Sequence, residues 1–288
     1  MARNPARYLY VLPALALVGV FIYYGIVYNA FASLTRWDGI SATREHVGFR
    51  NFRLLWHDTE FLAAVRHTVY FGIVTIAAQA LLGFTLAWLV SKRIVLSSLY
   101  KTIFFAPVVM APAVIAPVAR QMLAPDGQVN NFLNLVGLHR FNHAWLADPH
   151  WALYSLMAVN IWEWTGFSFV LYYAALGQID PEIYQAARID GASDWRTMWR
   201  IAWPLCKPTT FTLVILGAIS SVKVFDLVFL ITGVGPAGST DVVTTYIYRE
   251  SVVDFHAGYG AAIAMYMLGA ALVLTVFQLR LYRGRQHA

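Results

Sequence analysis

Three ionisable side chains interrupt long apolar stretches of this sequence: Glu163, Lys223 and Asp226. A charge inside a membrane-length apolar run is costly, so such residues are candidates for binding or transport chemistry. Lys223 and Asp226 are three positions apart and would share one face of a continuous helix, where they can also form a mutually satisfied structural pair. The sequence leaves both interpretations open.

The segment around Glu163 has the composition of a site for a polar, ring-shaped solute. Asn160 and Glu163 supply hydrogen-bonding groups, while Trp164 and Phe167 supply flat aromatic faces. A sugar presents hydroxyls to the first kind of group and CH patches to the second, and sites for polar small molecules combine both. The alternative is that Trp162 and Trp164 only pack in the core or lie at the membrane interface.

Several other kinds of chemistry are excluded by the residue inventory. Cys206 is the single cysteine, so the chain forms neither an internal disulfide nor a cysteine metal site. The eight histidines are dispersed, and the sequence contains neither a serine elbow nor the G-x-x-x-x-G-K-[ST] run that holds nucleotide phosphates. We therefore expect no catalytic residue, no metal and no nucleotide site in this chain.

The composition indicates a protein that spans the lipid bilayer. Of 288 residues, 59% are hydrophobic and 12% are charged, against about 25% charged in soluble domains. The mean hydropathy is +0.57. The formal net charge is +6, but the basic residues lie at the ends of apolar runs, which indicates membrane topology and not a nucleic-acid partner.

Six apolar runs predict an all-α membrane protein with six transmembrane helices in one domain, residues 1–288. The runs are 8–34, 68–90, 102–123, 151–176, 211–232 and 259–279. The first run is too long for the apolar part of a secretory signal peptide. Pro107, Pro112 and Pro117 predict a kink in the third helix, because proline removes a backbone donor and crowds the preceding turn.

The distribution of Lys and Arg predicts the orientation. Arg3 and Arg7 near the amino end, Lys92 and Arg93 after the second run, the loop after the fourth run and the carboxyl-terminal tail together carry a clear excess of positive charge. The loops on the other side are close to neutral. The positive-inside rule therefore predicts that both termini and the loop 178–208 lie in the cytoplasm.

This cytoplasmic loop carries strong helix signals. Asp180 is a suitable N-cap, Pro181 suits the first helical position and Gly191 suits the left-handed residue that ends a helix. We expect one short helix from Pro181 to Asp190. A second helix should begin at Ser193 and stop at Pro204.

The exposed face of this hairpin predicts a docking element. Ala186 and Ala187 are small enough to allow another backbone to approach, and Tyr184, Trp195 and Trp199 are aromatic anchors of the kind found at interface centres. The alternative is a connector that packs on itself, with its tryptophans touching only lipid headgroups.

The same loop resembles the EAA loop of binding-protein-dependent ABC importer permeases. The family pattern is E-A-A, three residues, G, nine residues, then I-x-L-P. This sequence has Gln185-Ala186-Ala187, then Gly191, then Ile201-Ala202-Trp203-Pro204 at the same spacing. The flanking Ile179 to Tyr184 and Ile189 to Ala192 look specifically like the carbohydrate permeases of the maltose and glycerol-phosphate group.

The resemblance implies a permease of the prokaryotic cytoplasmic membrane without catalysis of its own. Its implied partners are a second permease subunit, an ABC ATPase dimer that carries ATP and Mg, and an extracytoplasmic protein that delivers a sugar. The residues implied in coupling to the ATPase are Tyr184, Gln185, Ala186, Ala187, Asp190, Gly191 and Pro204. Gln185 stands where the family has glutamate, so it offers a neutral hydrogen bond and not an ion pair.

The resemblance also implies a position for the substrate path. In the maltose-type permeases the sugar contacts lie on the spans before and after the coupling loop. Matched residue by residue, the implied lining positions are Asn160, Glu163, Trp164, Phe167, Gly217 and Ser221. The alternative function is an ion-coupled secondary transporter of a small polar solute that uses Glu163, Lys223 and Asp226, although no inverted repeat is evident.

Overall fold

The computed structural model describes residues 10–92 and 97–286, and these form two compact units. The first unit is drawn from Met1–Leu62 and Tyr246–Arg283, and the second from Ala63–Thr245 and Gly284–Ala288. Arg3, Arg7 and Arg93, and the start of the first predicted span at Tyr8, lie outside the described residues. The single domain 1–288 stays a prediction.

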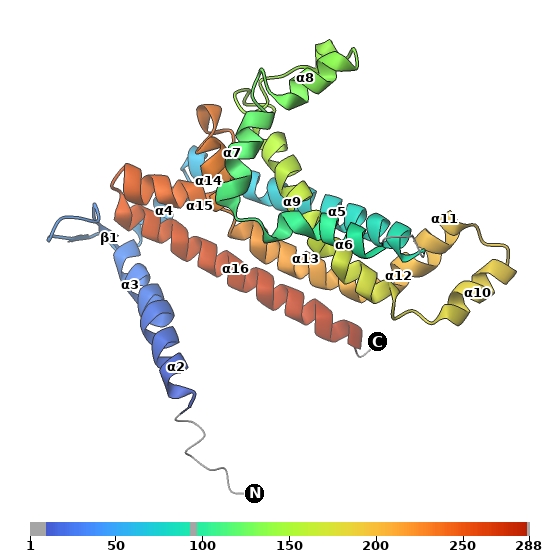
Figure 1. The fold of residues 1–288 in the computed structure, drawn as a ribbon. Helices are drawn as coiled ribbons and strands as arrows, with labels where there is room; N and C mark the ends of the chain where they lie inside the picture. The colour runs from blue at the N-terminus through green and yellow to red at the C-terminus, as the bar shows by residue number, and fades with distance from the viewer. Residues whose placement is uncertain (1–9, 93–96, 287–288) are drawn as a thin grey trace, which may run out of the picture. The chain divides into compact units, whose positions relative to one another are not determined.

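The first unit contains the first and last long helices of the chain (Figure 1). Its main elements are α2 (Leu12–Val18), the π-turn η1 (Gly19–Tyr23), α3 (Tyr24–Ser33), β1 (Thr35–Arg36), β2 (Glu45–His46), α4 (Arg50–Leu55), the π-turn η6 (Arg249–Val253) and α16 (Ala257–Gln286). The two short strands pair in antiparallel fashion, with Thr35 opposite His46. They form a small hairpin that follows α3.

A buried asparagine joins three elements of this unit. The Asn51 Nδ2 donates hydrogen bonds to the carbonyl oxygens of Ser33 and Thr35, each at 2.9 Å, and of Gly258 at 3.3 Å. Gly258 has no room for a side chain, because a Cβ there would lie 2.0 Å from the Thr35 carbonyl oxygen. The start of α16 is therefore fixed against β1 by backbone contact.

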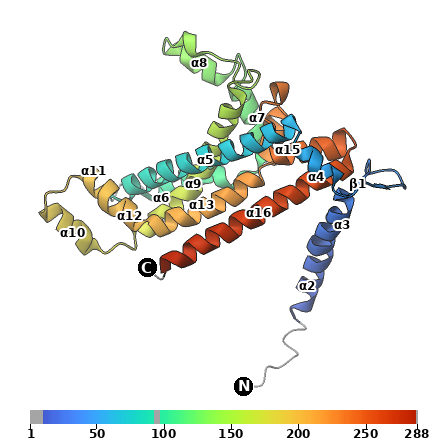
Figure 2. The same cartoon turned by 180° about the vertical axis from the view of Figure 1, so that it is seen from behind.

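The second unit contains the remaining helices. Its long elements are α5 (Thr59–Ser91), α6 (Ser97–Phe105), η2 (Ala106–Val109), α7 (Pro112–Met122), α9 (Ala152–Leu176), α13 (Lys207–Val222) and α14 (Asp226–Thr232). The shorter ones are α8 (Gln128–Leu135), η3 (His139–Phe141), α10 (Pro181–Ile189), α11 (Asp194–Thr197), η4 (Met198–Ala202), α12 (Trp203–Leu205), η5 (Pro236–Gly238) and α15 (Val243–Tyr248). Both views show α10 and α11 extending beyond the end of α13 (Figures 1 and 2).

Two hydrophobic clusters hold the second unit together. One is built around Phe84, Phe169 and Tyr172, each fully buried. The other contains Leu156 and Val228 in contact with residues of α5 and α7. Because α5 and α9 each contribute to both clusters, these two helices join the two halves of this unit.

The third predicted span is more than kinked: it is broken. Its two halves, Ser98–Val109 and Pro112–Met122, are bent by 97°. Ala111 is extended, with ψ of 142°, and Pro112 begins a new helix. Proline disfavours a helical conformation in the residue before it, which explains the position of the break. Pro117 is accommodated inside α7 without ending it.

The fifth predicted span, 211–232, is wrong as a continuous helix. Helix α13 ends at Val222, and α14 begins only at Asp226. The intervening Phe225 has φ of −135° and ψ of −62°, outside the helical region. The Thr244 hydroxyl donates a hydrogen bond to the carbonyl oxygen of Val224, so a side chain from another helix satisfies one acceptor freed by the break.

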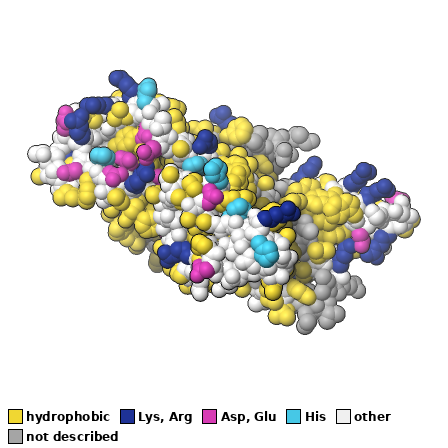
Figure 3. All heavy atoms as spheres, turned by 90° about the horizontal axis from the view of Figure 1, so that it is seen from above, with side chains coloured by type: hydrophobic (Ala, Val, Ile, Leu, Met, Phe, Trp, Pro, Cys, Tyr) yellow, Lys and Arg dark blue, Asp and Glu magenta, His cyan; other side chains and the backbone are white. Residues whose placement is uncertain are grey.

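Helix length and composition confirm an apolar membrane protein without fixing six spans. Among the described residues, Leu12–Ser33, Thr59–Ser91 and Ala257–Gln278 are each long and apolar enough to cross a membrane. Two bent pairs raise this number to five if each pair is one span. Helix α9 lies outside this set, since its polar residues lower its hydropathy. Hydrophobic side chains cover large parts of the visible surface, while charged side chains gather in separate patches (Figure 3).

Candidate functional site: a polar pocket and an exposed hairpin

A pocket of about 200 Å³ lies among α5, α9 and α13 in the second unit. Its wall includes Phe71 and Leu227 of one hydrophobic cluster and Leu213 of the other, so it lies where the two clusters meet. Apolar packing on both sides fixes the helices, and the polar side chains between them face the cavity. A pocket with a few convergent polar groups in an apolar wall is the usual form of a small-molecule site.

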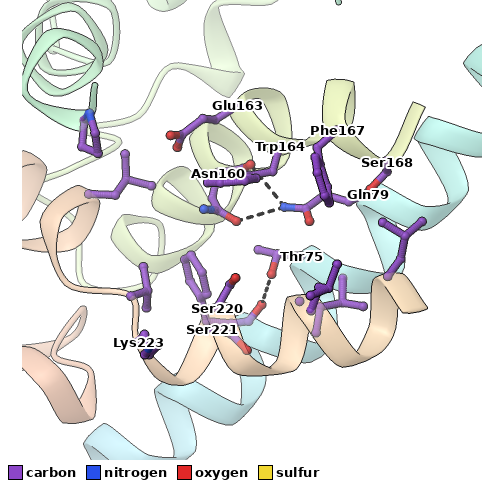
Figure 4. Close-up of a pocket in the computed structure, with 18 of the residues that line it drawn as sticks. Thr75, Gln79, Asn160, Glu163, Trp164, Phe167, Ser168, Ser220, Ser221 and Lys223 are labelled. Atoms are coloured by element: carbon purple, nitrogen blue, oxygen red, sulfur yellow. Dashed lines mark hydrogen bonds between the residues drawn. The ribbon is translucent and has the colours of Figure 1, made fainter. Parts of the chain in front are cut away.

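All six predicted substrate residues line this pocket. Asn160, Glu163, Trp164 and Phe167 come from α9, and Gly217 and Ser221 come from α13. Figure 4 shows the α9 residues and the α13 residues on opposite walls. The structure therefore brings these residues together, and their role in binding substrate stays a prediction.

The polar groups of the pocket are held in defined positions. The Gln79 Nε2 of α5 donates to the Asn160 side-chain oxygen at 3.0 Å and to the Asn160 carbonyl oxygen at 3.2 Å (Figure 4). Glu163 is buried, with 3% of its surface exposed. A carboxyl and two amides in one enclosed space can exchange hydrogen bonds with the hydroxyls of a bound solute.

Lys223 and Asp226 also line the pocket, but not as the expected pair. The break after Val222 places Lys223 at the C-cap of α13 and Asp226 at the first turn of α14. The continuous helix face on which the structural pair depended is thus absent, and no ion pair between these two residues occurs in the described structure. Both side chains are exposed, and both remain accessible to a solute.

Four polar residues of this pocket were not predicted from the sequence: Thr75, Gln79, Ser168 and Ser220. Neutral hydroxyl and amide side chains are common in membrane helices, so these four residues carry a weaker sequence signal than a charge does. A signal was present for Gln79, since an amide inside the second apolar run needs a buried partner. That partner is Asn160, which is 81 positions away.

Close backbone approach fixes α9 beside α6. A Cβ on Gly166 would lie 1.9 Å from the Phe104 carbonyl oxygen, and a Cβ on Gly83 would lie 2.6 Å from the Ser168 Cβ. Gly217 is similarly confined, since its Cβ would lie 2.7 Å from the Ile76 Cγ1. The helices that line the pocket therefore meet at glycines, which makes the pocket depend on their small size.

The hairpin that follows α9 is built by local signals. Helix α10 begins where predicted, with the Asp180 side chain accepting a hydrogen bond from the Glu182 backbone N–H at 2.9 Å. It ends at Ile189, and Asp190 is its C-cap. The Gly191 N–H donates to the Arg188 carbonyl oxygen, which closes the helix together with the left-handed φ of +71° at Gly191.

The second helical segment differs from its prediction. The Ser193 side chain caps it by accepting from the Arg196 N–H at 3.3 Å, as expected. It then passes from α11 through the π-turn η4 into α12, which extends beyond Pro204 to Leu205. The continuous segment therefore ends one residue after the predicted stop at Pro204. Pro204 is half-buried.

Several residues predicted to face a partner instead pack within the chain. Ala187 is buried at 5% exposure, and Tyr184 is half-buried with its ring centroid 5.9 Å from that of Trp88. The half-buried Trp199 contacts Phe84 and Trp203. These side chains fasten the hairpin to α5, because their apolar surfaces are removed from water there.

The exposed face of the hairpin consists of other residues. Ile189 is 86% exposed and Trp195 is 69% exposed. Gln185, Ala186, Asp190 and Gly191 are also exposed. The Asp194 carboxylate pairs with the Lys92 ammonium at 2.6 Å, which ties the start of α11 to the end of α5. Large apolar side chains on a rigidly held surface element are typical of a docking site.

These features define a class: an α-helical membrane protein with broken helices, a polar pocket between them and an exposed helical hairpin. Residues 79–287 match the family model of the binding-protein-dependent transport system inner membrane component. The chain belongs to this family.

The chain is similar to several ABC permease proteins over nearly its whole length. A probable ABC transporter permease protein YurN of Bacillus subtilis is 31% identical, with 96% of this chain and 95% of the relative covered. The lactose transport system permease protein LacF of Rhizobium radiobacter is 32% identical, with 97% and 94% covered. A solved bacterial alginate ABC transporter, in complex with a periplasmic protein that carries an alginate pentasaccharide, contains a chain of similar fold. Its TM-score is 0.82 at 25% identity, with 95% of this chain and 92% of that chain covered.

Proposed function

We propose that this chain is a membrane-spanning permease subunit of a sugar ABC importer. The match to the family over residues 79–287 carries this proposal. The named relatives support a carbohydrate substrate, since LacF is a lactose permease protein and MalF of Thermococcus litoralis, 29% identical, is a trehalose/maltose permease protein. The chain pairs with a second permease, receives its solute from an external binding protein and depends on separate ATPase subunits.

The pocket among α5, α9 and α13 is the proposed contact surface for the sugar. Asn160, Glu163, Gln79 and Ser221 supply hydrogen-bonding groups, and Trp164 supplies an aromatic face. At about 200 Å³ the cavity is smaller than the about 300–1,000 Å³ of most ligand sites. This size fits a half-site that a second permease subunit completes.

The hairpin of α10 and α11 is the proposed contact for the ATPase. We assign docking to its exposed face, with Ile189 and Trp195 beside Gln185, Ala186, Asp190 and Gly191. The buried Ala187 and the half-buried Tyr184 act instead by holding the hairpin against its own unit, and the half-buried Pro204 lies near the end of the helix that follows. Six spans with both termini in the cytoplasm are part of this proposal, and this topology places the hairpin on the ATPase side of the membrane.

Co-purification tests the proposed function. The tagged chain, extracted in mild detergent, should recover an ABC-type ATPase and a second permease, identified by mass spectrometry. Ile189→Arg should lose the ATPase while keeping the second permease, because it places a charge in the apolar contact. The matched control is Ile40→Arg, at a residue that is 76% exposed between β1 and β2, which should keep both partners.

The ion-coupled alternative makes the opposite prediction. Uptake by this chain alone, driven by an ion gradient and independent of ATP, would contradict the importer proposal. Family membership does not favour this outcome. The break between α13 and α14 places Lys223 and Asp226 in the lining of the proposed sugar pocket, so it needs no ion-coupled mechanism.

A further inference from the structure

A second and larger cavity lies wholly within the first unit. It has a volume of about 760 Å³ and is lined by residues around β1, the α4–α5 junction, η6 and the start of α16. Its size lies within the range of about 300–1,000 Å³ that is usual for small-molecule sites. The proposed sugar-contact residues are elsewhere in the chain, so the function derived above leaves this cavity without a role.

Asp58 accepts four hydrogen bonds, and these hold two tyrosines of the cavity lining in place. One Asp58 carboxylate oxygen accepts the backbone N–H groups of Glu60 and Phe61 at 2.9 and 3.1 Å. The other accepts the phenolic O–H groups of Tyr246 and Tyr259. Burial opposes the charge, but these hydrogen bonds hold the pKa of Asp58 below its usual value. With its charge satisfied by four donors, Asp58 positions the two tyrosines, whose oxygens can still accept hydrogen bonds.

A strained aromatic residue forms another part of the wall. Phe255 has a left-handed φ of +54°, which is rare for a bulky residue, and 50% of its surface is exposed. The turn is held by the His256 N–H donating to the Glu250 carbonyl oxygen at 2.7 Å and by the His256 ring on the Glu250 carboxylate at 3.0 Å. Backbone strain that the surroundings maintain at a half-exposed phenylalanine indicates a functional position.

Trp37 and His57 line another part of the cavity, and hydrogen bonds hold both side chains in place. Trp37 donates its ring N–H to the Ser41 carbonyl oxygen at 2.8 Å, and the Arg44 guanidinium stacks 3.8 Å from the centroid of its ring. The His57 Nδ1 lies 3.1 Å from the Arg53 carbonyl oxygen and therefore carries its proton. The Nε2 of His57 can take part in a further hydrogen bond. Aromatic faces and hydrogen-bonding groups thus alternate around one space.

We propose that this cavity is a second carbohydrate site, which binds a neutral saccharide independently of the pocket on α9. Trp37 and Phe255 would stack on the CH faces of the ring, and Glu250, His57 and the tyrosine oxygens would take its hydroxyls. An anionic sugar is disfavoured, because the cavity lining holds three carboxylates, Asp38, Asp58 and Glu250, against one guanidinium, that of Arg36, which itself pairs with Glu45. In the proposed topology these segments lie outside the membrane, so the site meets the solute before the translocation pocket does.

Direct binding in the absence of the external binding protein tests this site. The complex of the chain with its partner subunits, reconstituted in nanodiscs, is titrated with radiolabelled maltose, lactose and glucose. Phe255→Gly removes the aromatic face and also relieves the positive φ, so the variant should fold at least as well. We expect its affinity for the bound sugar to fall by about tenfold, in line with the loss of one aromatic contact.

Two further variants make the result specific. Phe255→Tyr keeps the ring and should restore binding, whereas Asn160→Ala alters the α9 pocket and should leave binding at the second site unchanged. The proposal is overturned if the unaltered complex binds none of the three sugars or if Phe255→Gly binds as well as the parent. It is also overturned if Phe255→Gly weakens only the association of the external binding protein, which would make the cavity a protein-docking surface. ATP-driven uptake, measured separately, reports on the importer function itself.

Discussion

The hairpin of α10 and α11 and the pocket among α5, α9 and α13 are built in opposite ways. The hydrogen bonds that shape the hairpin join near neighbours, such as Asp180 with Glu182 and Gly191 with Arg188. The bond that shapes the pocket joins Gln79 to Asn160 across 81 positions. A docking element can thus be specified locally, while a binding pocket in the same unit depends on long-range packing.

The largest expected effect comes from filling a glycine beside the pocket. In Gly166→Ala the new Cβ would lie 1.9 Å from the Phe104 carbonyl oxygen. Since the clash is with backbone, no side-chain rotation relieves it, and we expect a loss of about 3 kcal/mol or more in unfolding free energy. Thermal unfolding in detergent measures this loss.

The control for this change is Gly177→Ala, at the C-cap of the same helix. Its Cβ would lie 3.5 Å from the Ala174 carbonyl oxygen, an ordinary contact, so stability should hardly change. Equal stability of both variants would show that α9 does not depend on close approach to α6.

A smaller effect on stability, with a large effect on transport, is expected at the turn of the hairpin. Gly191 has φ of +71° and no neighbouring atom that a Cβ would meet. Gly191→Val therefore costs only the left-handed backbone strain, about 1–2 kcal/mol, and this cost is confined to the hairpin. We expect normal membrane insertion and a near-complete loss of ATP-driven uptake.

Asparagine tolerates the left-handed conformation, so Gly191→Asn should keep most of the transport. Normal uptake by Gly191→Val would count against a coupling role for this turn. Loss of insertion would show that the hairpin, like the pocket, is needed for the fold.

The smallest expected effect is the loss of the cap on α10. Asp180→Ala removes the acceptor for the Glu182 N–H and should weaken the first turn of the helix by about 1 kcal/mol. Amide hydrogen exchange should become faster at residues 182–185 and remain unchanged in α9. Asp180→Asn retains a capping oxygen and should exchange like the parent. Faster exchange that spreads into α9 would contradict the local origin of this hairpin.

The sequence alone predicted the hairpin more accurately than the spans. The cap at Asp180, the glycine turn and the second cap at Ser193 were all correct, because each depends on residues two to three positions apart. The predicted fourth span, 151–176, agrees with α9 to one residue, since a continuous apolar run followed by Gly177 marks its bounds.

The errors have a common physical origin. Continuity of the run 211–232 suggested one helix, but the break after Val222 is stabilised by Thr244 from another helix. Ala187 was predicted to be exposed on the hairpin, yet it is buried because the hairpin packs against its own unit. In each case a partner distant in sequence decides the local structure.

The sequence by itself determined the membrane class, the family pattern of the cytoplasmic loop, the caps of its helices and the residue types of a polar pocket. These properties follow from composition and from hydrogen bonds between near neighbours. Only the tertiary structure decided that the six predicted lining residues share one cavity, that Lys223 and Asp226 are separated by a break, and that a second cavity surrounds Phe255. The reason is that helices meet at glycines and through polar pairs such as Gln79 with Asn160, and these partners lie far apart along the chain.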